Sequence, residues 1–154
     1  MGSLKNTLFK KSALAIFLII SSGFLVFFIF NHEQSSSLRK LEINKTTVNI
    51  EIAANQGQKI KGLSGKNYLP ANQGILFVED ESKKISIWMK DMRFAIDIVW
   101  IDENFKIIHI ENNVQPDSFP KIFSSQEPAR YVLEVNAGFT TENNIKVGDK
   151  IKLQ

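Results

Sequence analysis

The residue most able to do chemistry is Asp97, because it places a carboxylate inside an apolar segment. It is flanked by Ile96, Ile98 and Val99, in a strand where a charge can hardly avoid burial. A buried carboxylate needs hydrogen-bond partners or a shifted pKa. Asp97 is therefore either a ligand-binding or acid/base group, or a structural anchor bonded to the backbone of residues 90–93. We favour the anchor, because structural networks also hold buried carboxylates.

Lys90 and Glu134 are the other charged residues that could complete a site. The sequence places Lys90 at a strand end, on the same face as Trp88 and Ser86, where it could bind an anion. It is otherwise a solvated lysine or a partner of Asp97 or Glu134. A catalytic hypothesis therefore uses Asp97 with Lys90 or Glu134 as acid and base.

Trp88 and Trp100 are the only tryptophans of the chain. If exposed, their rings could stack on sugars or on peptide side chains. Packing in the core is the more common role of such residues. The candidate ligand-binding residues are therefore Trp88, Lys90, Asp97 and Trp100.

Several other chemistries lack the residues that they need. The chain has no cysteine, and its two histidines, His32 and His109, are too far apart to form a metal-ligand motif. The segment around Ser64 (GLSG) misses the G-x-S-x-G pattern of hydrolases by one position. No glycine-rich turn opens a nucleotide-binding unit. We expect neither a metal nor a cofactor.

The elements that position these residues are mainly short strands. Val48, Ile50 and Ile52 alternate with polar residues, as in a strand with one buried face. Asn55 is the predicted cap of a short helix that buries Ile60 and Leu63. The remaining expectations are a hairpin of 74–79 with 85–89, a second hairpin of 95–101 with 105–110, an irregular loop over 112–128, a strand at 130–135, a helical turn at 140–144 and a last strand at 150–153.

These elements predict an α+β domain that is mainly β. We expect about seven short strands in a small antiparallel barrel, with one or two short helices and no βαβ unit. The predicted organisation of the chain is a cytoplasmic N-terminus over 1–11, a transmembrane helix over 12–30, a tether over 31–45 and an extracytoplasmic domain over 46–154.

The membrane helix is predicted from 19 residues, 12–30, that carry no charge. About 20 apolar residues span a bilayer as a helix. Lys5, Lys10 and Lys11 precede this segment, so the positive-inside rule keeps the N-terminus in the cytoplasm. Of the formal charge of +3, residues 1–37 carry +2, and the remaining domain is nearly neutral. Nucleic acid is therefore not an expected partner.

The exported domain resembles the bacterial and archaeal family known as domain of unknown function 192, over residues 46–153. The resemblance depends on the segments GLS at 62–64, GILF at 74–77, WMKDM at 88–92, IDIVWID at 96–102, PARYVLEV at 128–135 and GD at 148–149. It implies a compact domain that is often exported or anchored, and it implies no particular chemistry.

Three functions are compatible with these residues. The first is a non-catalytic binding module, tethered near the membrane, for an envelope polymer, a peptide or a partner protein. The second is an enzyme that uses Asp97 with Lys90 or Glu134, and the third is a structural component of the envelope. We favour the first, because catalytic sites usually show more converging polar groups.

Overall fold

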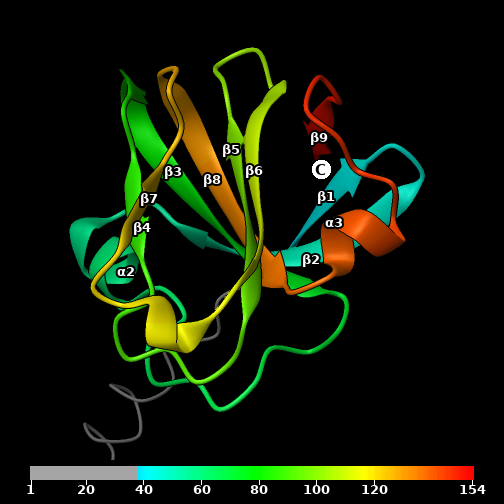
Figure 1. The fold of residues 1–154 in the computed structure, drawn as a ribbon. Helices are drawn as coiled ribbons and strands as arrows, with labels where there is room; N and C mark the ends of the chain where they lie inside the picture. Colours follow the sequence, from blue (N-terminus) through cyan, green and yellow to red (C-terminus); the bar gives the residue numbers. More distant parts are fainter. Residues whose placement is uncertain (1–37) are drawn as a thin grey trace, which may run out of the picture. The chain divides into compact units, whose positions relative to one another are not determined.

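Seven strands form one strongly curled sheet, and two more form a small second sheet (Figure 1). The computed structural model describes residues 38–154 of the chain. The elements in chain order are β1 (Arg39–Ile43), β2 (Thr46–Ala53), α2 (Gln56–Lys61), β3 (Gln73–Lys83), β4 (Ser86–Trp88), β5 (Ile96–Ile101), β6 (Ile107–Val114), the 3-10 helix η1 (Pro116–Ser118), β7 (Ile122–Ser124), β8 (Ala129–Asn136), α3 (Phe139–Glu142) and β9 (Ile151–Leu153).

The large sheet has the strand order β6-β5-β8-β3-β2-β1-β9. Its neighbours are antiparallel except β2 and β3, which run parallel and are joined through α2. The expectations of a wholly antiparallel sheet and of no βαβ unit were therefore wrong. A parallel pair needs a crossover connection, and the short helix α2 with the loop after it provides one.

The curl brings the two edge strands of the large sheet together at one end. Lys106 forms an isolated antiparallel bridge with Lys150. The backbone N–H of Ile107 donates to Asp149 O over 2.8 Å, and that of Ile151 donates to Phe105 O over 2.9 Å. The mainly β class is thus confirmed, and the predicted barrel is a curled sheet whose edges meet at this end.

The curled sheet has a hydrophobic core on each face, because successive side chains of a strand point to opposite sides. All six residues of β5 are buried. Ile98 and Trp100 belong to a first core with Leu63 and Met89. Val99 and Ile101 belong to a second core on the other face. A polar side chain on β5 or β8 is therefore enclosed in one of two separate environments.

The small sheet pairs β4 with β7, so the predicted hairpin of 74–79 with 85–89 was wrong. The strand that contains Gly74 pairs with β2 and β8 instead. A Cβ on Gly74 would lie 2.8 Å from the backbone oxygen of Glu134, so this close approach requires glycine. The second predicted hairpin, β5 with β6, is confirmed.

Asn55 caps α2 as predicted, and its side chain accepts a hydrogen bond from the backbone of Gln58. Leu63 is buried, but Ile60 is 71% exposed, which contradicts its predicted place inside. Residues 39–43, assigned to the tether, form β1. The irregular loop expected over 112–128 contains β7.

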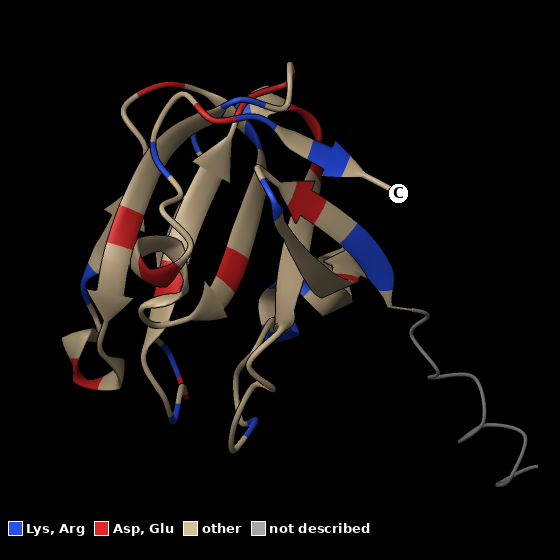
Figure 2. Ribbon diagram, turned by 90° about the vertical axis from the view of Figure 1, so that its right-hand side faces the viewer, with Lys and Arg blue, Asp and Glu red and all other residues tan. Residues whose placement is uncertain are grey.

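The predicted cytoplasmic segment 1–11 and membrane helix 12–30 lie outside the described residues. Within residues 38–154, no helix has the length and apolar character needed to cross a bilayer. Figure 2 shows charged residues of both signs interspersed over this part of the chain, with long uncharged stretches along the strands.

Candidate functional site

Asp97 is completely buried, and its carboxylate accepts four hydrogen bonds. Oδ1 accepts from the backbone N–H of Asn113 (2.8 Å) and of Gly138 (3.1 Å). Oδ2 accepts from the backbone N–H (2.9 Å) and the hydroxyl (2.6 Å) of Thr140. The prediction that the backbone of residues 90–93 binds this carboxylate was therefore wrong. The carboxylate joins β5 to the end of β6 and to the start of α3, and both oxygens are occupied.

Asp97 and Glu134 lie on opposite faces of the sheet. In the register of β5 with β8, Asp97 pairs with Val135, and Ile98 pairs with Glu134. Because paired residues share a face, Asp97 points into the second core and Glu134 towards the first. The structure does not bring these two carboxyl groups together.

Of the other predicted site residues, Lys90 is exposed and Trp100 is buried in the core. Lys90 is exposed in the turn after β4, and its backbone oxygen accepts a hydrogen bond from the Ser64 hydroxyl over 2.8 Å. Trp100 is fully buried, and its indole N–H donates to Ile85 O over 3.0 Å. Trp100 is therefore a core residue with a satisfied polar atom and no surface for a ligand.

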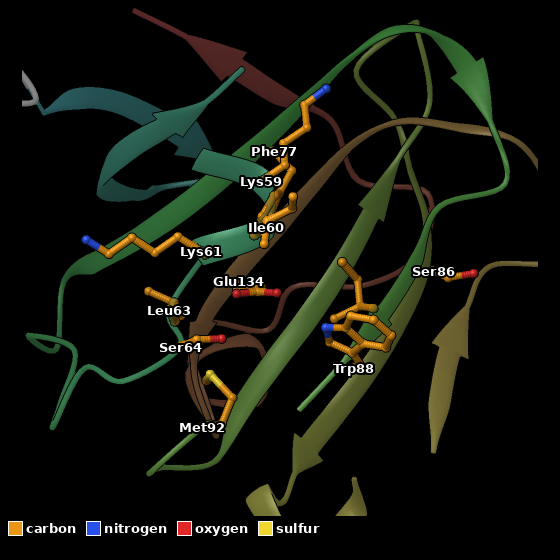
Figure 3. Close-up of a pocket in the computed structure, with 12 residues that line it drawn as sticks. Lys59, Ile60, Lys61, Leu63, Ser64, Phe77, Ser86, Trp88, Met92 and Glu134 are labelled. Carbon is orange, nitrogen blue, oxygen red and sulfur yellow. The ribbon is translucent and has the colours of Figure 1, made fainter. Parts of the chain in front are cut away.

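A small pocket lies over Glu134, with α2 and the following turn on one side and Trp88 on the other (Figure 3). Its volume is about 80 Å³. Phe77 and Met92 also line it. The side chain of Glu134 lies at its floor, and this residue is only 5% exposed. Of the predicted site residues, the structure thus brings Trp88 and Glu134 to one pocket.

The carboxyl group of Glu134 has no hydrogen-bond partner among residues 38–154, and its oxygens are open to the pocket. Burial raises its pKa to about 8, because the charged form loses its hydration in the pocket. Lys59 also lines the pocket, but its amine is bound to Glu79 Oε2 over 2.9 Å. The amine of Lys61 points away from the carboxyl group (Figure 3). Glu134 is therefore a buried acid that is mostly protonated at neutral pH.

The rim of the pocket is apolar and exposed. Trp88 is 56% exposed, and its ring meets that of Phe119 edge to face, with centroids 6.4 Å apart. Ile122, the partner of Trp88 in the small sheet, is exposed, and so is Ile60 of α2. Exposed apolar side chains that gather in one place mark interaction sites more often than isolated ones do.

From the sequence, Glu134 was predicted only as a partner of Asp97 or Lys90, and the pocket around it was not predicted. A signal was present, because Glu134 stands between Leu133 and Val135 as Asp97 stands between isoleucines. The residues of α2, β3 and β4 that complete the pocket could not be predicted, because these segments are distant in the sequence and meet only in the folded domain. No group of three or more acidic or histidine side chains within the described residues is placed to hold a metal ion.

Comparison with known proteins identifies the domain. The model of the DUF192 family, described as "Uncharacterized ACR", matches residues 39–153. Among curated proteins, none matches this chain.

Two solved structures share the fold. A protein of Sinorhizobium meliloti 1021, proposed to be a transcription regulator, is 27% identical, with a TM-score of 0.74 over 79% of this chain and 97% of its own. A protein of unknown function from Novosphingobium aromaticivorans DSM 12444 is 22% identical, with a TM-score of 0.72. The match covers 78% of this chain and 89% of that protein's chain. Both solved chains consist of little more than this domain, so residues 38–154 are expected to fold alone.

Proposed function

The chain belongs to the DUF192 family, a family of unknown function, and from its Glu134 pocket we propose that it is a binding module for one projecting group of a larger partner. The observation that carries the proposal is a buried acid without a hydrogen-bond partner, facing a small pocket with an exposed apolar rim. An unpaired buried polar group destabilises a fold, and such groups are held where a ligand completes them.

The size of the pocket decides what can enter it. Sites that enclose a whole small molecule usually measure roughly 300 to 1,000 Å³. At about 80 Å³, this pocket accepts a side chain or a chain end and no more. The rest of the affinity has to come from the rim, where Trp88, Phe119 and Ile122 are exposed. Aromatic rims of this kind are typical of peptide and protein recognition.

The two other functions have less support from this geometry. Acid/base catalysis needs a second group within hydrogen-bond reach of the same substrate atom. Asp97 lies on the other face of the sheet, and the exposed Lys90 does not line the pocket. A purely structural role would leave the burial of Glu134 without a compensating partner. The binding function accounts for both the acid and the rim.

Binding of a peptide to the rim is tested by selecting random peptides on immobilised residues 38–154. We expect Trp88→Ala to weaken the binding of selected peptides by about 30-fold, since central aromatic residues of an interface often contribute 2 kcal/mol or more. The matched control is Tyr68→Ala, which removes an aromatic side chain that is 72% exposed and does not line the pocket. Equal binding to wild type and Trp88→Ala would contradict the proposal.

We further propose that residues 12–30 anchor the chain and hold the domain outside the cytoplasm, near an envelope polymer, peptide or protein partner. The support is the uncharged segment and the lysines that precede it. With the outer barriers of the cell opened, an added protease is expected to digest residues 38–154 and to spare an epitope at the N-terminus. Protection of the domain in that experiment would overturn the orientation.

A further inference from the structure

Resting on the proposed binding function, we infer that the group received by the pocket is a primary ammonium of a peptide, either its N-terminus or a lysine side chain. The inference comes from the polar groups that the pocket leaves free and from the charges around Glu134.

The free hydrogen-bonding groups of the pocket beside α2 and Glu134 are acceptors, while Ser86 and Trp88 on the opposite wall keep a hydroxyl and an indole N–H. The backbone N–H groups of Gly62 and Ser64 are used by the carbonyl oxygens of Gln58 and Lys61. The hydroxyl hydrogen of Ser64 is used by Lys90 O, which leaves the hydroxyl oxygen as an acceptor. When Glu134 ionises, both of its oxygens are acceptors as well. A ligand with several donors complements these groups, and an ammonium has three.

No cation of the described residues neutralises Glu134. The titratable groups on the elements around the pocket are Lys59 and Lys61 of α2, Glu79 of β3, Arg130 on the same face of β8, and Lys90, Asp91 and Arg93 in the turn that carries Met92. Of these, only Lys59 and Lys61 line the pocket. The amine of Lys59 is bound to Glu79, which also binds Lys83 over 2.7 Å, and Lys61 points away. From β5, the residue that faces Glu134 is Ile98. The positive charge that Glu134 lacks therefore has to come with the ligand.

The walls of the pocket also favour a cation over an anion. Phe77 and Trp88 contribute aromatic rings, and Met92 contributes a thioether. The face of an aromatic ring attracts a cation, and tryptophan does so most strongly. An anionic ligand would meet the carboxyl group of Glu134 at the floor of the pocket.

Binding of an ammonium beside Glu134 should release a proton. In the free protein, burial raises the pKa of Glu134 to about 8, so its carboxyl group holds a proton at pH 7. A bound ammonium stabilises the ionised carboxylate, so the proton leaves to solvent when the ligand binds. Affinity for a lysine ammonium should then rise by about ninefold from pH 6 to pH 7 and by about fivefold from pH 7 to pH 8. A ligand that offers a carbonyl oxygen to the protonated acid would show the opposite dependence.

The experiment uses residues 38–154 and one peptide selected on the rim, prepared in three forms. The first has a free N-terminus and acetylated lysines, the second has an acetylated N-terminus and free lysines, and the third has both kinds of amine acetylated. Titration calorimetry from pH 6 to pH 10, in two buffers of different ionisation enthalpy, measures affinity and proton release together.

The expected result is that one amine-bearing form binds with proton release, and that the fully acetylated form binds at least tenfold more weakly at pH 8. An N-terminal amine, with a pKa of about 7.7 to 8.0, gives an affinity that peaks near pH 8. A lysine, with a pKa of about 10.4, gives a plateau that extends towards pH 10. These profiles distinguish the two sources of the ammonium.

Glu134→Gln should remove the rise in affinity between pH 6 and pH 8 and the proton release, while the control Glu127→Gln, at an exposed residue, should change neither. Thermal unfolding of both variants shows whether they are folded. The fully acetylated form could instead bind in a way that depends on Glu134 and weakens as the pH rises. That result would show that the ligand group is not an amine, but the pocket would still be a binding site. Binding of all forms that is insensitive to Trp88→Ala would overturn the proposed function itself.

Discussion

Replacing Asp97 with asparagine is expected to lower the free energy of unfolding of residues 38–154 by roughly 3 to 5 kcal/mol. The carboxylate accepts two hydrogen bonds at each oxygen. An asparagine keeps one acceptor oxygen and turns the other position into a donor. Whichever way the amide lies, at least one backbone N–H loses its partner and faces an N–H group, because only the Thr140 hydroxyl can turn away, towards Asn112 Oδ1. A hydrogen bond to a charged group contributes roughly 1.5 to 3 kcal/mol, and the bonds that remain become weaker because the amide is neutral.

Chemical denaturation of wild type and Asp97→Asn at pH 7 measures this loss. The matched control is Asp80→Asn, because Asp80 is exposed on β3 and its replacement should change stability by less than about 0.5 kcal/mol. Typical domains are stable by roughly 5 to 15 kcal/mol, so the Asp97 variant should remain folded but melt clearly earlier. An unchanged or higher midpoint would show that Asp97 is not the anchor of β6 and α3.

The second large effect is the pH dependence of stability that Glu134 imposes. Burial raises its pKa from 4.5 to about 8 in the folded protein. Between these two values the folded state binds more protons than the unfolded state, so stability falls as the pH rises. The contribution is most favourable below about pH 4.5 and is lost by about pH 8. One pKa unit corresponds to about 1.4 kcal/mol, so the loss between pH 5 and pH 8 is about 3 kcal/mol.

Glu134→Gln should remove this slope because the amide does not titrate. The variant and wild type are expected to have similar stability near pH 5, and the variant should be more stable by about 3 kcal/mol at pH 8. Urea denaturation at a series of pH values measures the difference, and Glu127→Gln, at an exposed position, provides the control. Parallel curves for wild type and Glu134→Gln would refute the burial of an unpaired acid.

Local patterns in the sequence were sufficient for elements whose contacts are local. The alternation of Val48, Ile50 and Ile52 predicted β2, and the cap at Asn55 predicted the start of α2. The pairing of strands was harder to predict, because it depends on contacts between distant segments. The charged turn 80–84 suggested a hairpin, but the strand before it runs on to Lys83 and pairs with β8. The strand after that turn pairs with β7 instead.

The same limit applies to the site. The burial of Asp97 was predicted correctly, since no exposed position fits a residue between Ile96 and Ile98. Its partners were not, because Gly138 and Thr140 follow it by more than 40 residues. The Glu134 pocket is formed by α2, β3, β4 and β8 together. Patterns among neighbouring residues in the sequence do not predict that these elements come together.

The pairing of the first strand of the domain with the last has a consequence for its biosynthesis. Leu41 of β1 lies opposite Leu153 of β9, near the end of the chain. While the polypeptide is being made, β1 emerges well before β9 and keeps an open edge until β9 has left the ribosome. An open edge can recruit strands from other chains. The domain therefore completes its sheet only after β9 has been made, and a chain shortened before β9 would leave this edge of β1 exposed.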